Sequence, residues 1–343
     1  MKIYRQIPLV IVFAGMTAWA YAQSNARADG PERSNQKFQG SVLNTTSGAG
    51  VKKEKVVVVT GVRFSYPLIQ KWIDRYNEVN PDVQIIIESR GTSDPAQYDI
   101  LAEVYEQDDQ IKKNREYLNI GRYAILPVAN SKSAFAKVYT EKGLDKELIQ
   151  QIYFHDLYAD ESVEKKVKAP YTIYTRLQKA GVPMVFTKYF GFEQKDIKGK
   201  AIAGADEHLV KALLRDSTGV TYLPLALIYN RDSKSPIDGL TVLPVDLNGN
   251  GRISADEKFY GDLSNVIRRL EEEKPKDIHN IPIEYLHLSI DKRNTSQEAV
   301  SFLRWIIQNG QQDLADFGYL KPAADRFEKE RSFFTTKGDK INN

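Results

Sequence analysis

The sequence predicts an α/β protein with mainly parallel sheets. Residues 56–60 are a β-branched run of the kind that forms a buried parallel strand. A stretch with helical apolar spacing follows, and then a second apolar run, Val83–Ile87. Strand-like and helix-like patterns continue to alternate as far as about residue 327, which is typical of α/β folds.

The start of the chain has the features of an export signal. Lys2 and Arg5 precede an apolar run at residues 7–13, and a small-x-small cleavage site ends at Ala22. The apolar run is too short to span a bilayer comfortably. We therefore expect residues 1–22 to be removed after Ala22 and the protein to act in the periplasm.

Composition excludes several classes of partner and site. The chain has 48 Lys and Arg against 45 Asp and Glu, a formal net charge of +3. So balanced a surface gives no reason to expect nucleic acid or a membrane as partner. The chain has no cysteine, which excludes a disulfide and a lipidated cysteine after the signal.

The rest of the chain divides by composition. Residues 23–54 are rich in Ser, Asn, Gly and charge without apolar periodicity, which predicts a flexible leader. Residues 328–343 are a charged tail. The region between them is long enough for one large domain or two small ones.

Apolar periodicity defines the elements that follow the first strand. The first helix is expected to bury Leu68, Ile69, Trp72, Ile73 and Tyr76. Residues 98–105 fit either a short helix or a short strand. Further strands are expected at 123–128, 171–174, 220–223 and 240–245, with two short extended pieces in 281–290. Further helices are expected at 144–152, 184–190, 207–214 and 299–307.

Two strand exits carry groups suited to an anion. Gly61 ends the first strand, and Ser65 and Tyr66 follow it, while the second strand leads into a loop with Thr92 and Ser93. Exits from one parallel sheet lie at the same edge, so hydroxyls, backbone N–H groups and a helix N-terminus are expected to meet there. The alternative is that these hydroxyls only cap helices.

The order of these segments resembles the phosphate-binding proteins that serve bacterial ABC importers. In that family a first strand, a small-residue loop, a PL..KW helix and a second Gly-Ser loop follow one another, as they do at residues 55–94. Residues 143–154, 204–223 and 299–322 are similar to later family segments in the same order.

The resemblance implies a two-lobed periplasmic-binding-protein-like fold. Each lobe would be a mainly parallel sheet flanked by helices, and two hinge strands would join the lobes. The chain would cross near Pro127 and return near residues 225–230. Lobe 1 would then comprise residues 55–127 and 231–327, and lobe 2 residues 128–230.

The resemblance also implies an anion site around one arginine. Arg176 matches the family's arginine, whose planar fork suits a bidentate grip on an oxyanion. Gly181 matches the family's glycine, but Ala180 and Val182 replace the Ser and Thr beside it. Two hydroxyl donors are therefore missing from the start of that helix.

Other charged residues are candidates to complete the site. We hypothesise that Arg63 or Arg90, in the first two loops, points inward and supplies charge. The alternative is that both are exposed and pair with acidic neighbours. The family uses a carboxylate to accept the proton of phosphate, and Asp94 and Asp99 are candidates for this role by position.

Residues 246–257, DLNGNGRISADE, match a calcium-binding loop. Gly251 occupies the tight-turn position and Ile253 the apolar one. A metal-free Asn-Gly turn is the alternative. We expect a weak structural Ca²⁺ site that braces lobe 1. Its predicted ligands are Asp246, Asn248, Asn250, the carbonyl of Arg252, Ser254 and Glu257.

These observations predict an extracytoplasmic solute-binding protein. It would capture phosphate or a similar oxyanion between the lobes and deliver it, as a monomer, to an ABC permease. The alternative is the same fold used as a sensor or scaffold, or for another anion, because of Ala180 and Val182. An enzyme is not expected, since GxSxG, HExxH and cysteine nucleophiles are absent and the four histidines lack metal-ligand spacing.

Overall fold

The computed structural model describes residues 55–90, 94–105, 113–155, 167, 169–293 and 295–336. These residues belong to one compact unit, Lys52–Asn343. The predicted signal peptide and leader lie outside the described residues. Within the described part of the chain, no helix is both long enough and apolar enough to cross a membrane.

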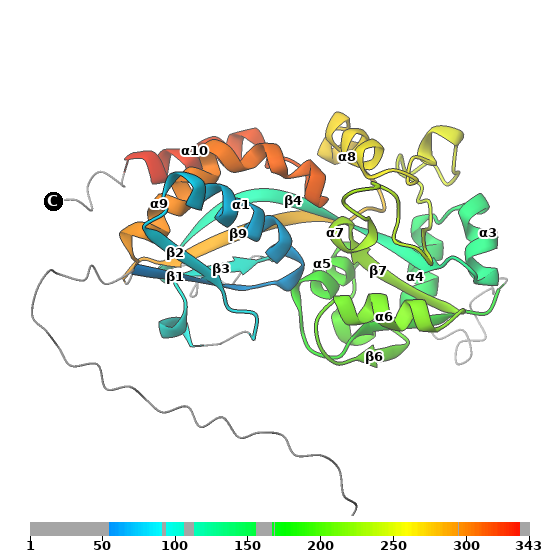
Figure 1. Ribbon diagram of the computed structural model, residues 1–343. Helices are drawn as coiled ribbons and strands as arrows, with labels where there is room; N and C mark the ends of the chain where they lie inside the picture. The colour runs from blue at the N-terminus through cyan, green and yellow to red at the C-terminus, as the bar shows by residue number, and fades with distance from the viewer. Residues whose placement is uncertain are drawn as a thin grey trace, which may run out of the picture. The chain divides into compact units, whose positions relative to one another are not determined.

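Nine described strands form one sheet in the order β2-β1-β3-β9-β4-β7-β5-β6, with β8 paired to β4 (Figure 1). Pairing is parallel at both ends of the sheet and antiparallel wherever β4 or β9 takes part. The α/β prediction is confirmed, and the sheet is mixed. The strands are β1 (Lys55–Gly61), β2 (Val83–Ile87), β3 (Ile100–Glu103), β4 (Arg115–Asn130), β5 (Thr172–Arg176), β6 (Lys200–Ile202), β7 (Gly219–Pro224), β8 (Leu240–Val242) and β9 (Ile283–Asp291).

The long strand β4 belongs to both halves of the sheet. Its first part, through Ala124, pairs with β9, and from Ile125 it pairs with β7. Its last three residues also pair with β8. The predicted crossing at Pro127 lies in the part that pairs with β7.

Helix α1 (Tyr66–Val79) covers the first half of the sheet with α9 (Gln297–Trp305) and α10 (Ala324–Thr336) (Figure 1). The five apolar residues predicted for its inner side are all buried. Pro67 lies in the first turn, where its missing N–H costs no hydrogen bond. The Trp72 indole N–H donates to the Gly310 carbonyl at 3.1 Å, which ties α1 to the π-helical turn Ile306–Gly310 that follows α9.

Helix α5 (Gly181–Phe190) packs on the second half of the sheet and begins near the candidate site. Its inner side packs through Phe186, which stacks on Tyr222 of β7 with ring centroids 4.4 Å apart. This packing fixes where the first turn of α5 lies. The other helices are α3 (Ala134–Lys142), α4 (Lys146–Phe154), α6 (Glu207–Arg215), α7 (Leu225–Ile228) and α8 (Leu263–Glu272).

Candidate functional site

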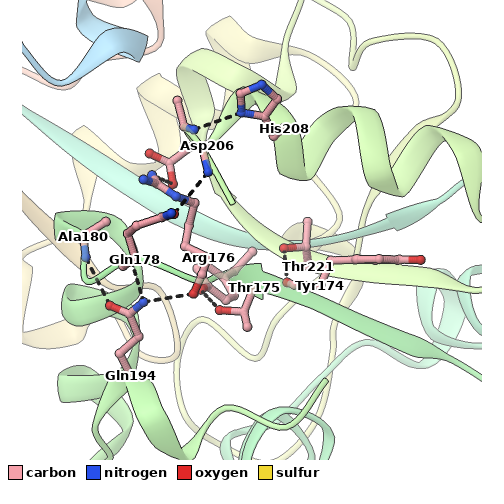
Figure 2. A network of polar contacts seen from close by, with 12 residues as sticks. Tyr174, Thr175, Arg176, Gln178, Ala180, Gln194, Asp206, His208 and Thr221 are labelled. Carbon is pink, nitrogen blue, oxygen red and sulfur yellow. Dashed lines mark hydrogen bonds and ion pairs between the residues drawn. The ribbon is translucent and has the colours of Figure 1, made fainter. Parts of the chain in front are cut away.

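Arg176 ends strand β5 and directs its guanidinium at Asp206, the residue before α6 (Figure 2). Nη1 of Arg176 lies 3.0 Å from Oδ1 of Asp206, and the two side chains are only 13% and 6% exposed. Within the described residues, neither Nε of Arg176 nor Oδ1 of Asp206 has an aligned hydrogen-bond partner. The contact is therefore an ion pair that leaves a buried donor on Arg176.

The pKa of Asp206 depends mainly on the burial of its side chain. Burial raises the pKa of the Asp206 carboxyl, and the nearby positive charge of Arg176 only partly opposes the rise. A carboxyl group that is removed from water is costly to ionise even beside an arginine.

The loop between β5 and α5 is held by Gln194 of the short helix η3 (Gln194–Asp196). Its side-chain amide donates to the carbonyls of Arg176 and Gln178 at 3.1 and 2.9 Å. Its oxygen accepts from the N–H of Ala180 at 3.2 Å. Figure 2 shows this amide lying across the loop. No local signal in the sequence pointed to Gln194.

The start of α5 approaches the end of β3 very closely. A Cβ atom on Gly181 would lie 2.4 Å from Cγ2 of Val104 and 2.9 Å from Cδ1 of Tyr105. Only a glycine fits there without a shift. The neighbouring Val182 is 1% exposed and packs in the core, so its side chain does not face solvent.

A pocket of about 1000 Å³ lies beside this loop. Thr175 and Arg176 of β5, Gln194, and one side of α5 form much of its wall, and Tyr105, Glu284 and Arg326 also contribute. Its charged lining is mainly basic, which suits an anionic ligand. The charged lining residues are Arg176, Lys179, Lys188, Lys195, Arg326, Glu193 and Glu284.

The residues predicted in the first loop do not line this pocket. Ser65 is fully buried, and its hydroxyl donates to the Val62 carbonyl at 2.7 Å. The Tyr66 hydroxyl donates to the carbonyl of Gly61 at 2.9 Å, and burial raises its pKa. Arg63 is exposed, as is Arg90 of the next loop, and neither lines the pocket.

The second predicted loop is only partly described. Thr92 and Ser93 lie outside the described residues. Asp94 accepts from the N–H of Ala96 at 3.0 Å, and Asp99 accepts from the N–H of Val58 at 2.8 Å. Neither aspartate lines the pocket. Their role as proton acceptors stays a prediction.

Comparisons with known proteins identify the architecture. No protein-family model matches the sequence, and no curated protein matches it. One similar structure is of a protein described as a phosphate ABC transporter substrate-binding protein, with bound phosphate, from Clostridium perfringens. It is 15% identical with a TM-score of 0.57, and the match covers 78% of this chain and 100% of that one.

A second structure, an ABC-type phosphate transport receptor from Vibrio cholerae, is 11% identical with a TM-score of 0.51. The match again covers 78% of this chain and 100% of that one. This chain has the fold of the periplasmic phosphate-binding proteins. The predicted two-lobed architecture is therefore confirmed.

The predicted calcium loop is held together by its own hydrogen bonds. Both oxygens of the Asp246 carboxylate accept loop N–H groups, from Asn250 at 3.1 Å and from Gly251 at 2.7 Å. The side-chain oxygen of Asn248 accepts from Asn250, and that of Asn250 accepts from the N–H of Arg252. Gly251 has a φ of +79°, which a glycine adopts without strain.

Glu257 closes the loop from inside. It is fully buried, and its two oxygens accept from the N–H groups of Leu247, Asn248 and Ser254 and from the Ser254 hydroxyl, at 2.7–3.2 Å. A bidentate grip on Ca²⁺ would have to share or replace these bonds. Among the described residues, no group of three or more His, Cys, Asp or Glu side chains could hold a metal. A calcium site built partly from neutral ligands stays a prediction.

The calcium loop and the residue after it contact the C-terminal end of helix α3. Ile253 lies against Gly143, where an added Cβ would approach Cγ1 of Ile253. The ammonium of Lys258 lies 3.2 Å from the Glu141 carboxylate. Both contacts are with residues that the predicted division assigns to lobe 2.

Proposed function

We propose that this protein is an extracytoplasmic solute-binding protein that captures phosphate or a related oxyanion for an ABC importer. It would act as a monomer in the periplasm after removal of residues 1–22 behind Ala22. Binding, and not catalysis, is its task in this proposal.

The buried guanidinium of Arg176 is the observation that supports this proposal. An oxyanion taken out of water needs charge-assisted donors, because leaving it unpaired costs several kcal/mol. Arg176 faces a mainly basic pocket and keeps a buried Nε without a partner among the described residues. Its planar fork can bind two oxygens of one anion at once.

Isothermal titration with phosphate, sulfate and molybdate tests the proposal. The protein is first unfolded and refolded to remove any carried-over ligand. Phosphate is expected to release heat, and Arg176→Lys to weaken its binding by about 10- to 100-fold, because the planar fork is lost while the charge that pairs with Asp206 is kept.

Arg268→Lys is the matched control. Arg268 is exposed and pairs with Glu272 on the surface of α8, so its variant should bind phosphate as the wild type does. Circular dichroism checks that all variants are folded. If the folded wild type binds none of the three anions, the proposal fails.

A further inference from the structure

The pocket beside Arg176 is much larger than an inorganic oxyanion needs. Its volume of about 1000 Å³ is at the upper end of the roughly 300–1000 Å³ that is typical of pockets for small organic ligands. A phosphate ion has five heavy atoms and would fill only a small part of it. Pockets of this size in proteins hold organic molecules.

One part of the pocket wall is apolar. Leu177, the residue after Arg176, lines the pocket and is 61% exposed. Met184 and Val185 of α5 also line the pocket, as does Phe192, and all three are only partly buried. An inorganic anion gains nothing from apolar surface, whereas an organic group that covers it is stabilised.

The start of α5 supplies no side-chain donor to an anion, since Ala180, Gly181 and Val182 have none. Ala180 has no side-chain donor, and its N–H already donates to Gln194. Val182 points into the core. An anion with one oxygen bonded to carbon has only three terminal oxygens to satisfy, so it tolerates this loss better than phosphate with four.

We propose that the ligand is a phosphate monoester whose organic group lies on the apolar wall. The phosphoryl group would bind at Arg176, and the organic group would contact Leu177 and Met184. This inference rests on the proposed function, since it assigns the anion to Arg176. It changes the expected substrate class from an inorganic ion to an organic phosphate.

Isothermal titration of the full chain with phosphate, phenyl phosphate and phenol tests this inference. Phenyl phosphate should bind at least about tenfold more tightly than phosphate, and phenol should not bind measurably. Leu177→Ser should weaken phenyl phosphate by about three- to tenfold and leave phosphate unchanged.

Leu214→Ser is the matched control for this surface change. Leu214 lies on α6, is 40% exposed and does not line the pocket. Its variant should bind both anions as the wild type does. Because both leucines are exposed, neither substitution is expected to prevent folding.

The outcomes separate this inference from the proposed function. If phosphate binds and phenyl phosphate binds no more tightly, the organic-phosphate assignment fails and the proposed function stands. If phenyl phosphate binds more tightly but Leu177→Ser weakens it no more than Leu214→Ser does, the assignment to this wall fails. If neither anion binds, both proposals fail. If phenol binds as tightly as phenyl phosphate, the organic-phosphate assignment fails.

Discussion

Arg176 and Asp206 form a buried ion pair whose closest atoms, Nη1 and Oδ1, are 3.0 Å apart. The pair joins the end of β5 to the start of α6, and burial raises the pKa of its carboxyl despite the arginine. At Asp206 the cost of removing charge from water therefore exceeds the gain from the neighbouring positive charge. An arriving anion and Asp206 would compete for one guanidinium.

The raised pKa of Asp206 predicts a specific pH dependence of stability. The folded protein holds this proton more tightly than the unfolded chain does. The resulting contribution to the free energy of unfolding is complete below about pH 4, the ordinary range of Asp, and is lost as pH rises through the raised pKa. Asp206→Asn removes the titration of this carboxyl group and leaves the other titratable groups of the protein in place.

Urea unfolding of wild type and Asp206→Asn between about pH 4 and pH 8 measures the effect. The wild type should lose stability relative to the variant as pH rises through this window. A constant difference between the two free energies across the series would contradict the raised pKa.

Gln194→Ala should destabilise the loop that carries Arg176. The substitution removes two donated bonds and one accepted bond from backbone groups of Arg176, Gln178 and Ala180. We expect a loss of about 1–3 kcal/mol in the free energy of unfolding, together with weaker anion binding. Gln70→Ala is the control, because Gln70 is exposed on α1 and its side-chain amide donates to the side chain of Asp74. Equal effects of the two substitutions would show that Gln194 does not hold the loop.

Gly181→Ala should force α5 away from the end of β3. The added methyl group would overlap Val104 and Tyr105, so the expected loss is about 1–3 kcal/mol of stability. Anion binding should weaken with it, because the loop from Arg176 leads directly into α5. Gly261→Ala is the matched control, since no atom lies within 4 Å of a Cβ built there. A Gly181→Ala protein as stable as the control would contradict the close approach.

Calcium should stabilise the protein if residues 246–257 bind it. Thermal unfolding is measured in excess Ca²⁺ and in EDTA. Free Ca²⁺ at 100 times its Kd should raise the free energy of unfolding by about 2.7 kcal/mol. Glu257→Gln should abolish the calcium effect, whereas Asp256→Asn, an exposed neighbour that is not a predicted ligand, should keep it. An unchanged wild-type melting temperature would assign the loop to the metal-free turn, closed by Glu257 alone.

The apolar spacing of the sequence predicted helices and strands correctly where one side of the element is apolar. The five buried residues of α1 and the bounds of β2 follow directly from spacing. β9 was predicted as two short pieces but is one strand, because polar residues such as His287 and Ser289 are buried along it and interrupt the apolar pattern. The first half of β4 was missed for the same reason, with Asn119 fully buried.

The candidate site was harder to predict because its partners meet only in the folded chain. Arg176 became a candidate through the family resemblance, but Asp206 lies in another connection and has the appearance of an ordinary helix cap in the sequence. Its side chain makes no cap hydrogen bond and pairs with Arg176 instead. Arg63 and Arg90 became candidates from loop position alone, and both are exposed. A role for either in anion binding stays a prediction.

The exchange of partners along β4 limits how the two ends of the sheet can move. Its backbone is hydrogen-bonded to β9 up to Ala124 and to β7 from Ile125, without a loop in between. A rotation of one end against the other must therefore be absorbed as bending and twisting of a continuous ribbon, spread over several peptides.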